Sequence, residues 1–173
     1  MTFASHVGLI RDVPDFPKPG IVFKDITPVL QHGPALRAAI DEMCAMSADF
    51  GAEVIVGIES RGFLFAAPMA YATGCGMAIV RKPGKLPAHC VRLDYALEYG
   101  SDRIEMHADA IVPGQRVLIV DDVLATGGTA AAAAQLVRSI GGNVVGFGFL
   151  IELDFLSGRT KLDGVPVASL LHY

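Results

Sequence analysis

The chain has 173 residues, 52% of them hydrophobic and 18% charged, a length within the range of about 100–200 that usually forms one domain. This composition is too apolar for a disordered chain and supplies enough material for a large core. The net charge of −4 and the sequence pI near 5.7 argue against general binding to nucleic acids or anionic membranes.

The first half of the chain predicts two helices separated by an irregular segment. Residues 2–11 are expected to form a short helix, and residues 33–50 a longer one with its apolar residues on one face. Between them, four prolines exclude a continuous helix or a central strand: Pro14, Pro17, Pro19 and Pro28. The apolar residues of this segment still indicate an ordered region that packs on something.

The second half alternates strands with helices. Short apolar runs predict buried strands at residues 54–58, 77–82, 116–120 and 143–153, with helices at 63–72 and 129–140. Pro68 should kink the first of these helices or mark its first turn. Residues 90–107 alternate apolar and charged residues, which suggests an antiparallel ribbon, and residues 165–173 could add an edge strand. This order predicts a mostly parallel sheet covered by helices on both faces.

The cysteines and the apolar runs favour a cytoplasmic location. Cys44, Cys75 and Cys90 are odd in number and lack paired short spacings, so neither a disulfide framework nor a zinc site is expected. The first ten residues carry no basic region of a signal peptide. The apolar runs are broken by Gly or Pro well before the roughly 20 residues that span a bilayer.

The most informative stretch is VLIVDDVLATGGT, residues 117–129. It joins an apolar strand, two adjacent carboxylates and a glycine-threonine loop that leads into an alanine-rich helix. Gly127 and Gly128 allow backbone amides to approach an anion, and the helix start adds free N–H groups and the positive end of the helix dipole. We therefore expect a phosphate at this loop, on the ligand side of the sheet.

Asp121 and Asp122 must face another part of the same ligand. Ribose hydroxyls, a magnesium ion and a positively charged sugar ring are each suitable partners for carboxylates, and a ribose 5-phosphate unit accounts for the loop and the acids together. A P-loop is excluded because Phe63 follows the Gly57–Gly62 spacing where lysine is needed. Acid pairs at strand ends and helices that begin with Gly-Thr are common separately, but here they are contiguous.

Residues 120–129 resemble the ribose-phosphate signature of the phosphoribosyltransferases. Further segments resemble the branch of that family that uses adenine, namely residues 14–30, 57–65, 81–87 and 97–100. The resemblance implies transfer of the phosphoribosyl group from phosphoribosyl diphosphate to adenine, giving AMP and diphosphate, with magnesium bound mainly through the substrate. It also implies a homodimer and a type I phosphoribosyltransferase-like α/β fold in one domain, residues 1–173, with an N-terminal hood at 1–30 and a flexible lid at 82–107.

The resemblance assigns roles to the phosphate-binding and sugar-binding positions. Asp121 and Asp122 would hold the ribose hydroxyls and favour an oxocarbenium-like transition state. The 5-phosphate would bind the loop Ala125, Thr126, Gly127, Gly128 and Thr129. The diphosphate loop would be Glu59, Ser60 and Arg61, which carries an unusual cis peptide bond in the family. The cations for the diphosphate would be Arg61, Arg81, Lys82 and Lys85, although a solvated basic face is the ordinary alternative for Arg81 and Lys85.

The resemblance also implies how the base is handled. Glu98 would transfer a proton at the imidazole side of adenine, Tyr99 would help close the site, and Arg61 would share in catalysis. Adenine would meet main-chain groups around Val22 and Lys24, with Phe23 against its ring. The ordinary alternatives are a surface glutamate for Glu98 and a core position for Phe23.

Two other functions compete with this interpretation. A non-catalytic ligand sensor would need a DNA-binding helix-turn-helix or a basic face, and a 173-residue chain with a net charge of −4 leaves room for neither. The second is transfer to a 6-oxopurine or to uracil, which would place a base-selecting side chain, often lysine, away from the hood.

Overall fold

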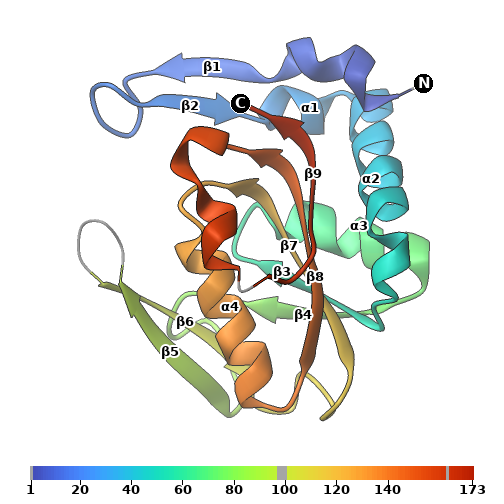
Figure 1. The fold of residues 1–173 in the computed structure, drawn as a ribbon, viewed down its shortest axis with the longest axis vertical. Coiled ribbons are helices and arrows are strands. Elements are labelled where there is room, and N and C mark those ends of the chain that lie inside the picture. Colours follow the sequence, from blue (N-terminus) through green and yellow to red (C-terminus); the bar gives the residue numbers. More distant parts are fainter. Residues whose placement is uncertain (1, 97–100, 163) are drawn as a thin grey trace. The chain divides into compact units, whose positions relative to one another are not determined.

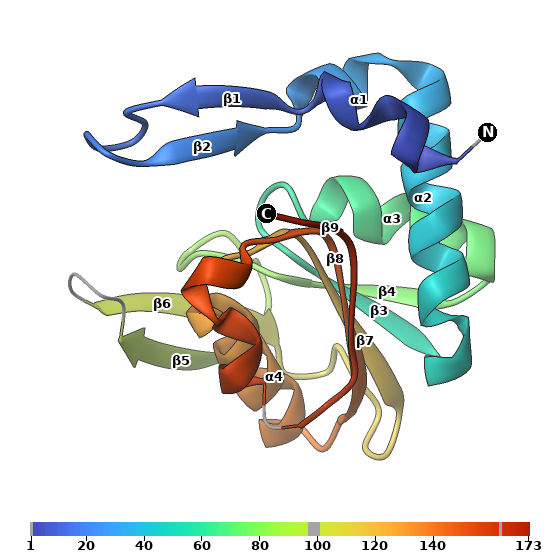
Figure 2. The same ribbon diagram turned by 45° about the horizontal axis from the view of Figure 1, so that its top comes forward.

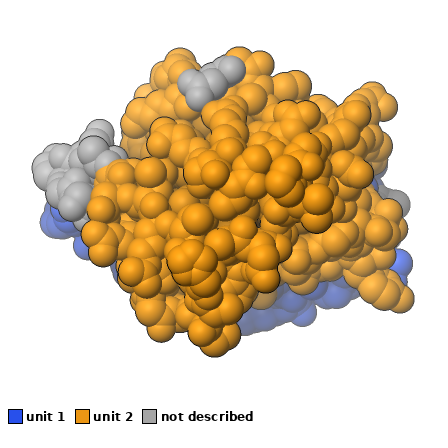
Figure 3. Space-filling model, turned by 90° about the horizontal axis from the view of Figure 1, so that it is seen from below, with its two compact units in different colours: residues 1–42 blue, residues 43–173 orange. Residues whose placement is uncertain are grey.

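The computed structural model describes residues 2–96, 101–162 and 164–173. The described chain divides into two compact units, Met1–Glu42 and Met43–Tyr173, which Figure 3 shows in different colours. The single domain, the hood and the lid expected from the sequence remain predictions. In the described part of the chain, no helix is both long enough and apolar enough to cross a membrane.

The N-terminal unit contains a two-stranded antiparallel sheet (Figure 1). Its elements are η1 (Phe3–Leu9), β1 (Arg11–Pro14), β2 (Val22–Asp25), α1 (Thr27–Gln31) and the first part of α2 (Gly33–Ser47). The helix expected at 2–11 is a 3-10 helix that ends before a strand. The sequence analysis excluded a central strand at the prolines, and this sheet is consistent with that prediction. Pro14 is the last residue of β1, and Pro17 and Pro19 lie in the connection between β1 and β2, where no ladder N–H is needed.

The C-terminal unit is built on a parallel sheet. Among the described residues, five strands follow the order β4-β3-β7-β8-β9, and each neighbouring pair is parallel. Their bounds are β3 (Val54–Ile58), β4 (Gly76–Val80), β7 (Arg116–Leu124), β8 (Asn143–Glu152) and β9 (Val167–His172). The parallel sheet and the edge strand expected at 165–173 are therefore confirmed.

Helices cover both faces of this sheet. The sheet grows from β3 to β4 in one direction and from β7 to β8 in the other, and right-handed crossovers then put the connecting helices on opposite faces. These helices are α3 (Phe63–Thr73) and α4 (Gly128–Ser139), as Figures 1 and 2 show. Pro68 lies inside α3. The alanines of α4 pack in one buried cluster with alternate residues of β3 and β7.

The remaining elements form a ribbon and short helical turns. β5 (Cys90–Ala96) and β6 (Ser101–His107) pair antiparallel, which confirms the expected ribbon. The ribbon is joined to the end of β4 because Arg81 and Glu105 exchange backbone hydrogen bonds of 2.8 and 2.9 Å. The short helical turns are η2 (Ala48–Phe50), η3 (Asp154–Leu156) and η4 (Gly158–Lys161).

Candidate active site

The candidate site lies where the strand order reverses. The connections from β3 and β7 leave the carboxyl edge of the sheet toward opposite sides, which is the usual position of a ligand in an open α/β sheet. A pocket of about 220 Å³ opens there, lined by Glu59 after β3, Arg81 and Lys82 after β4, and Asp121 in β7. The structure thus brings residues from three strands to one cavity.

A smaller pocket of about 70 Å³ adjoins it at the glycine-threonine loop. Its lining includes Asp121 and the loop residues Ala125, Thr126, Gly127, Gly128 and Thr129, so Asp121 and Thr129 line both pockets. Gly127 is the N-cap of α4 and has φ +77°, a left-handed conformation that favours glycine. Because the N-cap has no side chain, the first-turn N–H groups of α4 are left for an anion.

The two aspartates of β7 have different environments. Asp122 is buried, with a side chain 5% exposed, and forms an ion pair with Arg61. Asp121 faces the pocket on one side but is otherwise surrounded by protein, and its Oδ1 accepts a 2.9 Å hydrogen bond from the backbone N–H of Asp122. Burial, reinforced by the charge of Asp122, raises the pKa of Asp121 well above its usual range. The pair therefore resists holding two negative charges without a cationic partner.

Glu59 organises the cations predicted to bind a diphosphate. Its carboxylate forms ion pairs with Lys85 and with Arg81, the latter at 3.2 Å, and accepts a 2.8 Å hydrogen bond from the backbone N–H of Lys82. Burial alone would raise the pKa of Glu59, but these donors outweigh it and lower the pKa to about 2. The Glu59–Ser60 peptide bond is cis, as the resemblance implied.

The ribbon contacts the phosphate loop through Tyr95. The Tyr95 hydroxyl lies 3.2 Å from Thr129 Oγ1 and donates a 3.2 Å hydrogen bond to Asp102, which also pairs with Lys82. Burial opposes the charge on Lys82, yet the contact with Asp102 prevails and its pKa is raised above the ordinary value. One short polar chain therefore links the β4 loop, the ribbon and the start of α4.

Each predicted cation near the pocket is thus paired with an acid of the protein. Arg61 contacts Asp122, Lys82 contacts Asp102, and both Arg81 and Lys85 contact Glu59. Such charge-assisted contacts keep the cations oriented toward one region. A multiply charged anion could enter this region by replacing protein carboxylates as the partner of these groups.

The other predicted residues belong to the N-terminal unit, to the loop after β3, or to the part of the chain outside the described residues. Val22, Phe23 and Lys24 lie on β2 of the N-terminal unit, where Lys24 pairs with Asp12 at 2.7 Å. Ser60 is exposed in the loop after β3. Glu98 and Tyr99 fall outside the described residues, so their assigned roles remain predictions.

Three residues near the site were missed by the sequence analysis. Tyr95 and Asp102 face each other across the ribbon, and the side chain of Glu105, only 3% exposed, pairs with Arg92 at 2.8 Å and accepts a hydrogen bond from the Gly84 N–H. The alternating pattern that predicted the ribbon could also have predicted that Tyr95 and Asp102 pair. An antiparallel hairpin centred between residues 98 and 99 would place Tyr95 opposite Asp102.

The fold and the pocket define an α/β protein with a candidate phosphate-binding loop at the switch point of its sheet. Comparison with known proteins identifies the class further, since residues 29–167 match the model of the phosphoribosyl transferase domain. An adenine phosphoribosyltransferase of Solibacter usitatus is 58% identical over 165 residues, covering 95% of each chain.

Solved structures agree with this comparison. The crystal structure of adenine phosphoribosyltransferase from Thermoanaerobacter pseudethanolicus has a TM-score of 0.97 and 51% identity, covering 99% of this chain and 100% of that one. The enzyme from Saccharomyces cerevisiae, complexed with an imino-altritol bisphosphate and adenine, has a TM-score of 0.91 and 42% identity over 97% and 98% of the chains. The chain belongs to the phosphoribosyltransferase family, in its adenine phosphoribosyltransferase branch.

Proposed function

We propose that this chain transfers the 5-phosphoribosyl group from phosphoribosyl diphosphate to adenine, giving AMP and diphosphate in purine salvage. In this reaction the bond between the anomeric carbon and the diphosphate oxygen breaks, and a bond from that carbon to adenine N9 forms. The proton of N9 leaves to a base, and positive charge develops on the ribose ring. The observation that carries the proposal is the switch-point pocket of a family member, in which Asp121 adjoins the phosphate loop.

The sugar phosphate is expected to bind between the two pockets. The loop residues 125–129 would take the 5-phosphate with backbone N–H groups and threonine hydroxyls. Asp121 lines both pockets, so its carboxyl group is suited to the ribose hydroxyls of a ligand whose phosphate lies in the loop. As the ring becomes cationic, Asp121 and Asp122 would stabilise it electrostatically.

The diphosphate would bind by exchange of ionic partners. Arg61, Arg81, Lys82 and Lys85 would turn from carboxylates of the protein toward phosphate oxygens. Charge-assisted contacts of this kind are about twice as strong as neutral hydrogen bonds. Glu59 is acceptor-only when ionised, so its side chain serves the diphosphate indirectly, by holding Arg81 and Lys85.

Adenine recognition and proton transfer are assigned by resemblance to residues of the N-terminal unit and to residues 98 and 99, which lie outside the described residues. Main-chain groups near Val22 and Lys24 would read the edge of the base, and Phe23 would pack on its ring. Glu98 would accept the N9 proton, a contribution typically worth about 10²–10⁴ in rate. Tyr99 would help exclude water from the cationic sugar.

Magnesium is proposed as the cofactor, carried mainly by the oxygens of the diphosphate and ribose. Its fit rests on the carboxyl group of Asp121, which lines the pocket and offers the oxygen ligands that magnesium prefers. The ion would neutralise part of the charge of the leaving group. Asp121 and the cations around Glu59 position the substrate that carries it.

A homodimer in the cytoplasm completes the proposal. Large apolar side chains of α3 are exposed in the single chain, Tyr71 by 92% and Leu64 by 45%, which supports an interface on this helix. Within the described residues, Cys44, Cys75 and Cys90 form no disulfide bond, as suits a reducing compartment. Sedimentation equilibrium would test the dimer, and a mass equal to one chain at micromolar concentration would refute it.

The activity is tested by supplying phosphoribosyl diphosphate, magnesium and one nucleobase at a time. We expect diphosphate release with adenine and much less with hypoxanthine, guanine or uracil. Adenine-independent release, or a preference for a 6-oxopurine or uracil, would refute the adenine assignment.

The role of Glu98 is tested with Glu98→Gln. This variant keeps the size of the side chain but removes its ability to accept a proton, so turnover should fall by about 10²-fold or more. AMP affinity, measured by calorimetry, should stay nearly unchanged. An equal loss of turnover and AMP affinity would instead assign Glu98 a structural role.

A further inference from the structure

The backbone of Gly158 lies directly against the phosphate loop. A Cβ built on Gly158 would lie 2.1 Å from the carbonyl oxygen of Ala125 and 2.9 Å from the backbone nitrogen of Gly127. Reciprocally, a Cβ on Gly127 would lie 2.3 Å from the carbonyl oxygen of Gly158. Real Cβ atoms do not approach backbone atoms this closely, so both positions require glycine.

An ion pair fixes the segment that carries Gly158. Arg159 donates to both oxygens of Glu152, at 2.9 and 2.5 Å, and its Nη1 donates to the carbonyl oxygen of Val167 at 3.0 Å. Glu152 is the last residue of β8, its side chain is 6% exposed, and Ser169 donates a further 2.7 Å hydrogen bond to it. This bidentate contact ties the turn after β8 to the sheet.

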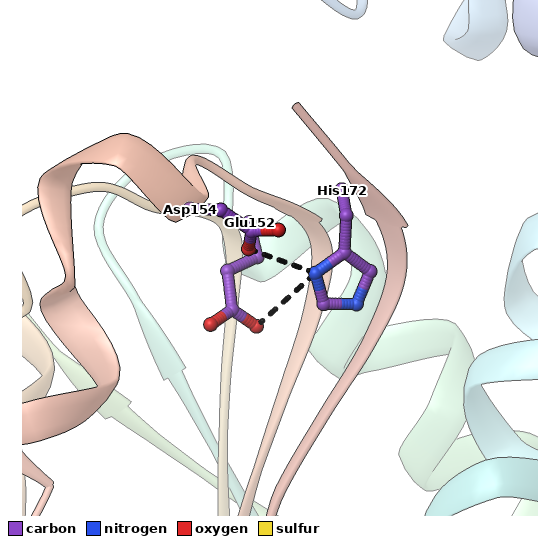
Figure 4. Close-up of side chains that lie close together, drawn as sticks. All are labelled: Glu152, Asp154 and His172. Atoms are coloured by element: carbon purple, nitrogen blue, oxygen red, sulfur yellow. Dashed lines mark hydrogen bonds and ion pairs between the residues drawn. The ribbon is translucent and has the colours of Figure 1, made fainter.

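The same region contains Glu152, Asp154 and His172 close together, as Figure 4 shows. Their ligand atoms lie within 4.8 Å of one another, a spacing that would suit a metal ion. Both Glu152 oxygens already accept hydrogen bonds from Arg159, however, and Asp154 contacts His172 Nδ1 at 2.9 Å. The cluster is therefore better explained as a second stabilising contact, in which Asp154 and His172 join η3 to β9.

The end of β8 is also joined to the strand that leads into the phosphate loop. The Leu153 N–H donates a 2.9 Å hydrogen bond to the carbonyl oxygen of Leu124, the residue before Ala125. The phosphate loop is thus held at its start by β8 and at its middle by Gly158. Both supports come from the end of β8 and the turn that follows it.

We propose that Gly158, held by the Glu152–Arg159 ion pair, positions the phosphate loop for the 5-phosphate of the substrate. The proposal rests on the proposed function and adds positioning residues to it. Contact with Gly158 keeps Gly127 in its left-handed conformation, so that the N–H groups at the start of α4 are preorganised for the anion. The ion pairs of Glu59 with Arg81 and Lys85 involve neither Gly158 nor the Glu152–Arg159 pair.

The test compares two ligands that are expected to bind different groups, ribose 5-phosphate at the phosphate loop and inorganic diphosphate at the cations around Glu59. Calorimetry would measure the affinities of wild type, Gly158→Ala and Arg159→Lys for ribose 5-phosphate and for inorganic diphosphate. We expect Gly158→Ala to lower the affinity for ribose 5-phosphate by about tenfold or more, the loss typical of one weakened hydrogen bond to a charged group. Diphosphate affinity should change less than about twofold, and the KM for phosphoribosyl diphosphate should rise more than kcat falls.

Arg159→Lys keeps the charge but loses the forked contact with Glu152, so its effect should be in the same direction and smaller. Gly148→Ala is the matched control, because this glycine is also buried but an added Cβ would meet its nearest atom at 3.6 Å. It should bind both ligands as wild type does.

Each outcome bears on the proposal. An unchanged affinity of Gly158→Ala for ribose 5-phosphate overturns the proposal. An equal loss of affinity for both ligands also overturns it, because it indicates a general disturbance of the fold. If Gly158→Ala does not fold, the same comparison on Arg159→Lys and Glu152→Gln decides, and wild-type selectivity in both overturns the proposal. If wild type itself fails to bind ribose 5-phosphate or to use adenine, the proposed function fails instead.

Discussion

Arg61 is expected to stabilise the folded protein as well as to bind the diphosphate. It is the cationic partner of Asp122, a buried carboxylate next to a second, half-buried acid, Asp121, that lines the pocket. Replacing Arg61 by alanine leaves the two acids without this partner. The fold must then bear an uncompensated buried charge or take up a proton.

The size of the effect follows from the exposure of the two partners. Removing one member of a fully buried ion pair costs about 3–5 kcal/mol, whereas a fully exposed pair contributes about 0–1 kcal/mol. The Asp122 side chain is 5% exposed and the Arg61 side chain 45% exposed. We therefore expect Arg61→Ala to lower the free energy of unfolding by about 2 kcal/mol, between these limits, which corresponds to about 4–8 °C in Tm.

Urea unfolding at pH 7 measures this change in the free energy of unfolding, provided that the variant and the wild type have the same m-value. Adding Asp122→Asn to Arg61→Ala removes the unpaired charge and should recover part of the lost stability. Arg103→Ala is the matched control, since Arg103 is 49% exposed and pairs with the 63% exposed Asp94 at 2.5 Å. It should cost clearly less stability than Arg61→Ala does, because water screens an exposed pair. Equal losses for Arg61→Ala and Arg103→Ala, or no recovery in the double variant, would refute the reasoning.

Two further predictions concern the pH dependence of stability. The pKa of Asp121 is raised above its ordinary 3.8, so the folded state is favoured at low pH and loses this advantage as pH rises. In urea unfolding, Asp121→Asn should therefore become more stable than wild type as pH rises from 4 to 8, and a pH-independent difference in stability would contradict this. The substitution should also lower the affinity for ribose 5-phosphate. The pKa of Glu59 is lowered from 4.5 to about 2, so its contribution is full above pH 4.5 and declines below it. The destabilisation by Glu59→Gln should thus shrink as pH falls from 5 to 3, and one that grows instead would show that the ion pairs of Glu59 are not its source.

The sequence by itself determined the features whose cause is local. The apolar run 116–120 predicted β7 because a strand buried on both faces needs continuous apolar residues. The phosphate loop could be recognised for a similar reason, since its glycines, its threonines and the helix start are adjacent in the chain. The signature then indicated the family. By contrast, the N-terminal prolines only excluded a continuous helix and a central strand, and the hairpin of β1 and β2 was not predicted.

Tertiary structure decided which distant residues meet. Glu59 contacts Lys85 because β3 and β4 are neighbours in the sheet, and Tyr95 reaches Thr129 because the ribbon packs beside α4. No local pattern encodes such partners, since they depend on strand order and register. Gly158 is the clearest case. A glycine after a strand has many explanations in sequence, and only the close approach of its backbone to Gly127 shows that a side chain has no room there.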